Sequence, residues 1–114
     1  MSNFYEKYIS DYQSLFKEID IGQLIKLQKK IEIIKTTNNK VICQGNGGSA
    51  AIASHFAIDL SKNAKVKATN FNESSLITCL ANDYGYENWL KEALKINYDR
   101  GDLIILISSS GESK

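Results

Sequence analysis

Two short loops of this chain combine glycines with neutral polar side chains in a way that could bind an anion, and the first is GNGGS at residues 45–49. Three of the seven glycines in the 114 residues lie there. Glycine allows positive φ and a close approach of backbone to ligand, and a helix that begins after the loop directs free N–H groups at an anion. Ser49 is a candidate both for a phosphate ligand and for the helix N-cap. The residues of this loop also suit a tight turn between a strand and a helix that binds nothing.

The second loop, SSSGES at residues 108–113, directly follows the apolar run LIILI. Ligands of open parallel sheets bind beyond the carboxyl ends of the strands. Serine hydroxyls and backbone amides around a glycine can surround a phosphate, so the candidates are Ser108, Ser109, Ser110 and Ser113. A polar terminal segment without a ligand is the other interpretation. Two such loops after two buried strands would lie at the same sheet edge, which favours a phosphate site.

A histidine and two further polar residues could also carry chemistry. His55, the only histidine, and Asp59 have the i, i+4 spacing that places both on one helix face. They could ligate a divalent metal or share a proton, or they could be a simple surface pair. Asn82 and Asp83 interrupt a helical pattern, where they could bind sugar hydroxyls or end the helix. Trp89 and the tyrosines near it are expected in the core.

The periodicity of apolar residues indicates which elements must position these side chains. Spacings of three and four predict two N-terminal helices, and short β-branched or apolar runs predict strands. The LIILI run is typical of a strand buried on both faces. The alternation of strands and helices predicts an α/β protein with a parallel sheet. The expected elements are helices at 3–19 and 24–34, a strand at 40–44, a helix at 50–61, a strand at 65–69, an interrupted helix at 72–97 and a strand at 103–107.

The division into two parts follows from this pattern. Residues 1–38 form a helical extension, expected both to pack on the core and to form a subunit interface. Residues 39–114 form the α/β unit. A sheet of three strands with an exposed edge is expected to need partners.

Composition narrows the class of protein further. The net charge of +1 provides no general attraction to nucleic acid or to anionic membranes. No apolar stretch approaches the ~20 residues of a membrane span, and the N-terminus does not have the pattern of a signal peptide. Cys43 and Cys79 are expected to be buried free thiols of a reducing compartment, so a cytoplasmic location is expected.

Three segments together resemble the sugar isomerase (SIS) domain family in order and spacing. They are GNGGSAAIASHFAIDL, SSLITCLANDYGYE and GDLIILISSSGES. Among SIS domains the resemblance is greatest to bacterial phosphoheptose isomerases, which act on sedoheptulose 7-phosphate. It covers about residues 40–114, and the two N-terminal helices also fit the family.

The resemblance implies a three-layer αβα fold and assembly as a homotetramer. It implies that Asn46, Gly47 and Gly48 contact the substrate, that Asn82 and Asp83 bind sugar hydroxyls, and that Ser108, Ser109, Ser110 and Ser113 hold the phosphate. It also implies that His55 is a zinc ligand.

Two departures from the family pattern stand out. Asp59 occupies the position of a family glutamate that is both zinc ligand and catalytic base. Family members also continue beyond the residues seen here, and their C-terminal part supplies the remaining zinc ligands and the acid–base partner. The C-terminal part of the fold is therefore expected to be absent.

The function expected from this resemblance is aldose–ketose isomerisation through an enediol, to D-glycero-D-manno-heptose 7-phosphate for lipopolysaccharide or capsule. Asp59 would move the proton, with zinc at His55 and Asp59. With the remaining ligands outside this chain, its activity alone is expected to be low. The alternative is a non-catalytic SIS module that binds a phosphosugar or a protein partner.

Overall fold

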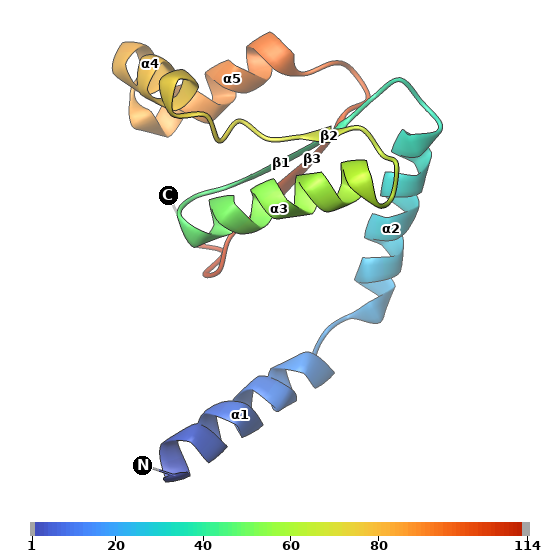
Figure 1. The fold of residues 1–114 in the computed structure, drawn as a ribbon, viewed down its shortest axis with the longest axis vertical. Helices are drawn as coiled ribbons and strands as arrows, with labels where there is room; N and C mark the ends of the chain where they lie inside the picture. The colour runs from blue at the N-terminus through green and yellow to red at the C-terminus, as the bar shows by residue number, and fades with distance from the viewer. Residues whose placement is uncertain (1, 113–114) are drawn as a thin grey trace.

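The computed structural model describes residues 2–112, so Ser113 lies outside the described residues. Five helices, one 3-10 turn and three strands alternate along this part of the chain (Figure 1). In chain order they are α1 (Ser2–Lys17), α2 (Ile21–Lys35), β1 (Val41–Gly45), α3 (Gly48–Lys62), β2 (Ala68–Thr69), α4 (Ser74–Tyr84), η1 (Tyr86–Asn88), α5 (Trp89–Asn97) and β3 (Leu103–Ile107).

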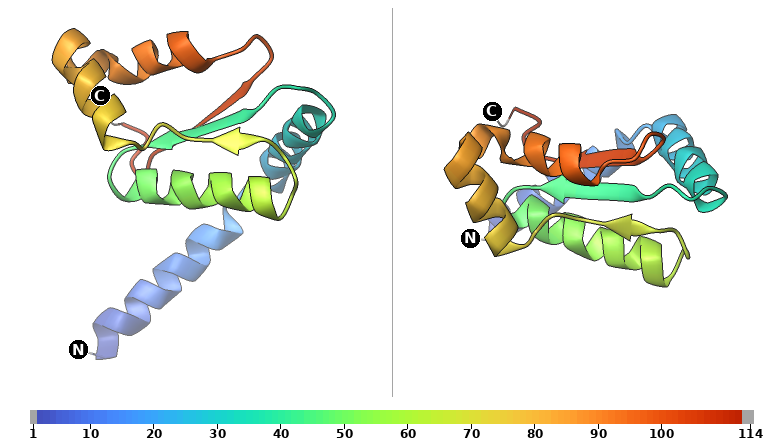
Figure 2. Two further views of the ribbon diagram at one scale, coloured as in Figure 1. Left: turned by 45° about the horizontal axis from the view of Figure 1, so that its top comes forward. Right: turned by 90° about the horizontal axis from the view of Figure 1, so that it is seen from above.

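The three strands form a parallel sheet in the order β2-β1-β3. Val41 pairs with Ala68 on one side and with Leu103 on the other, so β1 is the central strand. The α3 helix covers one face of the sheet, and α4 and α5 cover the other, as Figure 2 shows from two directions. The predicted three-layer αβα arrangement with a parallel sheet is therefore confirmed.

β1 is the strand whose side chains are buried on both faces of the sheet. Val41 and Cys43 pack against α2 and α3, whereas Ile42 packs against Trp89 and the other apolar residues of α4 and α5. Burial of the Cys43 thiol raises its pKa to about 11, which keeps it protonated at neutral pH.

The prediction that 103–107 is buried on both faces is wrong for the described residues. Leu103, Ile105 and Ile107 contact the α3 side, but Ile104 is 37% exposed and Leu106 is 67% exposed. The reason is the strand order, because β3 lies at the edge of the sheet.

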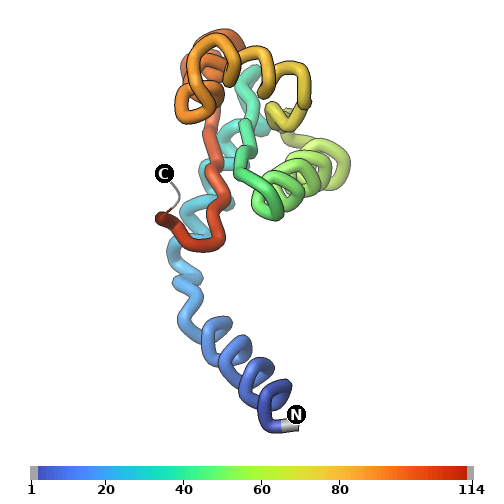
Figure 3. The backbone as a smooth tube through the Cα atoms, turned by 90° about the vertical axis from the view of Figure 1, so that its left-hand side faces the viewer, coloured from blue at the N-terminus to red at the C-terminus, as the bar shows by residue number. Residues whose placement is uncertain are grey.

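The N-terminal helices differ from the expectation of core packing. Every side chain of α1 from Asn3 to Lys17 is exposed, and the helix extends away from the sheet (Figure 3). In α2 only Ile34 is buried. Core packing is therefore wrong for α1, because no other described element lies against its apolar stripe. The division of the chain at residues 38 and 39 stays a prediction.

Two further expectations of burial are wrong. Cys79 is exposed on α4, because the helix faces the sheet with Leu80 instead. Tyr84 and Tyr86 are exposed, whereas Trp89 lies in the core as predicted. Within residues 2–112 no helix combines the length and the apolar character that a membrane span requires.

A buried carboxylate ties the amino ends of β1 and β3 together. The side chain of Asp102 is fully buried and lies 2.7 Å from Nζ of Lys40. Its oxygens also accept hydrogen bonds from the backbone N–H groups of Lys40 and Asp99 and from the Asn39 amide. Burial raises the pKa of this carboxyl, but the hydrogen bonds from Lys40 and its other partners outweigh burial and lower it to about 2.

Replacing Asp102 tests this network. We expect Asp102→Ala to lower the free energy of unfolding by about 2–3 kcal/mol, because several donors lose a buried acceptor. Asp99→Ala is the control, since Asp99 is 79% exposed and its ion pair with Lys40 should contribute less than about 1 kcal/mol.

The pH dependence of unfolding gives a second measurement on the same variants. Because the folded pKa of Asp102 is depressed, its contribution is complete above about pH 4 and is lost as the pH falls toward 2. The Asp102→Ala protein should lack this loss, and an unchanged slope would contradict the assignment.

Candidate phosphate-binding site

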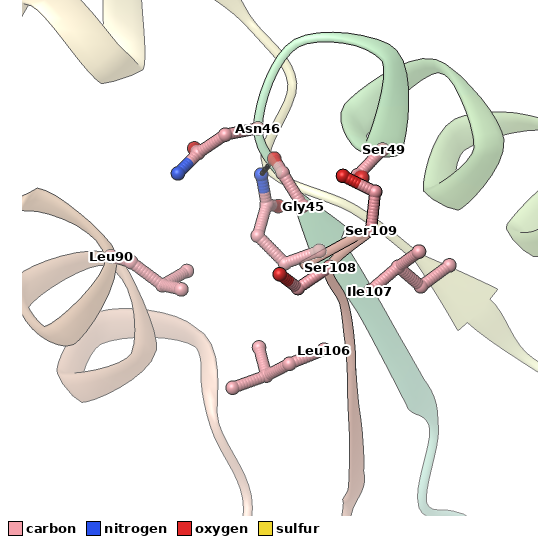
Figure 4. A pocket seen from close by; sticks show the side chains of 9 residues that line it. Gly45, Asn46, Ser49, Leu90, Leu106, Ile107, Ser108 and Ser109 are labelled. Atoms are coloured by element: carbon pink, nitrogen blue, oxygen red, sulfur yellow. Dashed lines mark hydrogen bonds between the residues drawn. The ribbon is translucent and has the colours of Figure 1, made fainter. Parts of the chain in front are cut away.

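A pocket of about 310 Å³ lies at the carboxyl ends of β1 and β3. The parallel pairing places Gly45 opposite Ile107, so the two loops that follow begin side by side. The predicted convergence of the loops at one sheet edge is therefore present, as Figure 4 shows. The pocket is lined by Gln44, Gly45, Asn46, Ser49, Leu90, Leu106, Ile107, Ser108 and Ser109.

The glycines of the first loop meet different requirements. A Cβ on Gly45 would lie 2.7 Å from the backbone carbonyl of Ser49, so a side chain there would prevent α3 from starting so close to β1. Gly47 has a φ of 54°, which favours glycine. A Cβ on Gly48 would meet no atom within 4 Å, so the space beside it is open.

The helix after this loop begins earlier than predicted. α3 starts at Gly48 with Gly47 as N-cap, so the prediction of Ser49 as N-cap is wrong. The positive φ of Gly47 turns the chain directly into the helix, which places Ser49 in the first turn. There Ser49 still lines the pocket, and its hydroxyl and the first N–H groups of α3 are available together.

The serine loop is held by its own hydroxyl groups. The backbone N–H of Gly111 donates to Oγ of Ser108 over 2.9 Å, and the N–H of Glu112 donates to Oγ of Ser110 over 3.1 Å. Ser108 and Ser109 line the pocket, but Ser110 does not. Within the described residues Ser109 makes no hydrogen bond through its hydroxyl, which leaves it available to a ligand.

Gln44 and Asn72 position the glycine loop, and neither was predicted. Gln44 is only 2% exposed, and its carboxamide donates to Asn72 over 2.7 Å and accepts from the N–H of Phe71 over 3.0 Å. Asn72 in turn donates to the carbonyl of Ala50 and to the hydroxyl of Ser54 in α3. These bonds join β1, α3 and the segment before α4 directly behind the loop. The sequence did contain a signal for this network: a glutamine lies inside the strand run VICQG, and a buried amide requires hydrogen-bond partners.

His55 and Asp59 lie together but outside the pocket. Their Nε2 and Oδ2 atoms are 3.6 Å apart on α3, and the side chains are 76% and 49% exposed. Asp59 also accepts from Asn63 over 3.2 Å. The predicted pairing on one helix face is present. In residues 2–112 no group of three or more His, Cys, Asp and Glu side chains lies close enough to hold a metal.

Asn82 and Asp83 lie in the last turn of α4, which ends at Gly85 rather than at the asparagine. The Asn82 amide donates to Oδ1 of Asp83 over 3.1 Å. Both side chains are exposed and neither lines the pocket. Asn82 and Asp83 are thus not among the lining residues, whereas Tyr86 in the following turn donates to Oδ1 of Asn46 over 3.4 Å.

The chemical character of the pocket suits a phosphate ester bound by neutral donors. None of its lining residues carries a charge, while hydroxyls, an amide and backbone N–H groups gather around it. The N-terminus of α3 adds a partial positive charge that favours an anion. Leu90 and Leu106 form an apolar side, so an ester with a carbon chain fits this lining better than a free polyanion.

Comparison with known proteins identifies relatives of the whole chain. A family model described as SIS domain matches residues 5–114. The phosphoheptose isomerase of Trichlorobacter lovleyi is 30% identical over 99% of this chain and 62% of its own length. Phosphoheptose isomerase 2 of Campylobacter jejuni is 36% identical over 90% of this chain and 54% of its own length.

A solved structure agrees with this result. Phosphoheptose isomerase GmhA from Neisseria gonorrhoeae superposes with a TM-score of 0.81 at 26% identity, over 98% of this chain and 60% of that one. The chain thus spans about three fifths of the length of these proteins.

Replacing Asn72 tests the network behind the glycine loop. We expect Asn72→Ala to reduce the free energy of unfolding by about 1–3 kcal/mol, because buried Gln44 loses its closest acceptor. Asn63→Ala removes an exposed side-chain hydrogen bond to Asp59 and should change stability by less than about 0.5 kcal/mol. Chemical denaturation measures both, and equal effects would contradict a special role of Asn72.

Proposed function

Because the chain belongs to the SIS domain family, we propose that its pocket binds the phosphate of a sugar phosphate and that the whole protein is a phosphoheptose isomerase. The proposed reaction converts sedoheptulose 7-phosphate to D-glycero-D-manno-heptose 7-phosphate. The names of the relatives support this choice of substrate.

One observation carries the proposal: two loops rich in glycine and serine converge on one pocket at the sheet edge. Asn46, Ser49, Ser108 and Ser109 supply neutral donors to the phosphate, together with the N-terminus of α3. The open space beside Gly47 and Gly48 allows the ester to approach their backbone. Ser110 and Ser113 complete the proposed phosphate ligands. Asn82 and Asp83 are the proposed ligands of the sugar hydroxyls.

The pair on α3 is the proposed zinc and proton-transfer site. An imidazole nitrogen and a carboxylate oxygen are ligands that zinc accepts, and their separation of 3.6 Å allows both to reach one ion at bonds of about 2.0–2.2 Å. His55 and Asp59 therefore fit two positions of a zinc site, and further ligands would come from outside residues 2–112. When bound, zinc would polarise the oxygens of the substrate.

Asp59 would act as the base that removes a proton from the carbon beside the carbonyl and returns it to the neighbouring carbon. The helix separates this carboxylate from the glycine loop by about three turns, or about 16 Å. A sugar held at the loop of the same chain would thus have to be long to reach Asp59. The separation favours a site completed by another part of the protein or by a second copy.

The exposed face of α1 supports assembly into a homo-oligomer, for which we propose a tetramer. The rings of Phe4, Tyr8, Tyr12 and Phe16 contact one another in succession along this helix, with centroids of neighbouring rings 5.4–6.4 Å apart. Such an aromatic stripe is costly in water and stable against another apolar surface. The proposed location is the cytoplasm, and the proposed product supplies lipopolysaccharide or capsule synthesis.

Binding to the pocket can be tested with Ser109→Ala. We expect the wild-type protein to bind sedoheptulose 7-phosphate and to discriminate against unphosphorylated sedoheptulose, as measured by calorimetry. The variant loses one hydroxyl that would donate a hydrogen bond to the charged phosphate, and this loss should weaken binding roughly 10- to 100-fold. Ser14→Ala, on exposed α1, should bind like the wild type. Equal affinity for both sugars would refute a phosphate site.

Replacing His55 tests the proposed zinc site separately from the phosphate pocket. We expect His55→Ala to weaken zinc binding more than about 10-fold, since even the loss of an outer partner of a ligand costs that much. Aldose formation should fall with zinc content, while the discrimination between phosphorylated and unphosphorylated sugar stays, because His55 is outside the pocket proposed to bind the phosphate. Metal analysis, a coupled isomerase assay and calorimetry measure the three quantities. Asp11→Asn, in an exposed i, i+4 pair on α1, is the control.

A second candidate function is phosphosugar binding without catalysis. The position of His55 and Asp59 outside the pocket favours it, because binding at the loops does not require them. This module would bind sedoheptulose 7-phosphate with the same discrimination but form no aldose in the presence of zinc. The isomerase assay on the wild-type protein therefore separates the two functions.

A further inference from the structure

Tyr86 connects the glycine loop to the helical layer on the opposite side of the pocket. Its phenolic hydroxyl donates to Oδ1 of Asn46 over 3.4 Å, although the two residues are 40 positions apart in the sequence. Tyr86 lies in η1, between α4 and α5, and its side chain is 60% exposed. A large aromatic residue so exposed at the edge of a pocket is not explained by core packing.

The turn that carries Tyr86 is held at both ends. Gly85 ends α4 with a φ of 86°, which favours glycine, and its N–H donates to the carbonyl of Ala81. The amide of Asn88 donates to the carbonyl of Tyr84 over 3.0 Å, and Trp89, the next residue, is buried against the sheet. The backbone of η1 is thus positioned by its neighbours, and the phenol extends from a supported base.

The bond affects how Asn46 presents its amide. With Oδ1 accepting from Tyr86, the Nδ2 group donates to no other side chain or backbone atom in residues 2–112. In Figure 4 this amide extends over the side of the pocket on which Leu90 lies. The two N–H bonds of Nδ2 are then available to oxygen atoms of a ligand in the pocket. Without the phenol, the amide could rotate and present its oxygen, which would repel those atoms.

We propose that Tyr86 is a positioning residue, which orients the Asn46 amide so that its N–H groups face the oxygens of the bound sugar phosphate. This inference rests on the proposed function of the pocket and adds a specificity residue to it. The hydroxyl of Tyr86 reaches Asn46 in the loop, but the residue does not fill the pocket, since Tyr86 is not among the lining residues.

Calorimetric titration of the full protein with sedoheptulose 7-phosphate tests the proposal. Tyr86→Phe keeps the ring and removes the donor, and we expect affinity to fall about three- to tenfold. Tyr84→Phe is the matched control, since Tyr84 is also exposed, lies two residues away and makes no side-chain hydrogen bond among the described residues. It should bind like the wild type. Both variants should keep the wild-type melting temperature, because neither hydroxyl is buried.

A double-mutant cycle with Asn46→Ala separates positioning from direct contact. If Tyr86 acts through Asn46, Tyr86→Phe has no further effect in the Asn46→Ala protein. An equal loss in both backgrounds would mean that Tyr86 touches the ligand itself and would overturn the inference.

The wild-type titration separates a failure of the inference about Tyr86 from a failure of the proposed function. Wild-type binding together with an unchanged Tyr86→Phe protein would overturn the inference and leave the proposed function standing. A wild-type protein that binds no sugar phosphate would overturn both.

Discussion

The burial of β1 on both faces and along both edges is the constraint on which the rest of the structure depends. Its neighbours are β2 and β3, and α3 lies on one face while α4 and α5 lie on the other. A strand enclosed in this way can meet solvent only at its ends. The chain leaves at Gly45, and the close approach of Ser49 requires that this residue has no side chain. The position of the pocket follows from this exit.

The two ends of the sheet illustrate opposite uses of polar groups. At the amino end, Asp102 is buried and its oxygens are occupied by Lys40 and backbone donors, so the charge stabilises the fold. At the carboxyl end, the hydroxyls and N–H groups of two loops face a pocket without charged side chains. Between them, Gln44 satisfies its buried amide through Asn72 and Phe71. Polar groups that are fully bonded inside the protein hold the loops, and those left open are the ones a ligand can use.

Membership in the SIS family and the position of the pocket support the same proposal, but the pocket concerns only one part of the proposed isomerase site. The pocket proposed to bind the phosphate lies within the described residues. His55 and Asp59, the pair proposed for zinc binding and proton transfer, lie on the solvent side of α3. The chain spans about three fifths of the length of these relatives. The exposed stripe of α1 has the character of a surface that another chain covers.

The sequence by itself determined the order of the elements, the parallel sheet and the two loops, because apolar periodicity and glycine placement act over a few residues at a time. It also identified His55 with Asp59, since residues four apart share a helix face. Only the tertiary structure decided which strand is central, so β1 is buried on both faces while β3, expected to be buried on both, has one face exposed. It also decided that Ser110, Asn82 and Asp83 lie outside the pocket, and that Gln44, Asn72 and Tyr86 act on the glycine loop. These contacts join residues 28 and 40 positions apart, and no local pattern specifies such pairs because they exist only after the sheet has formed.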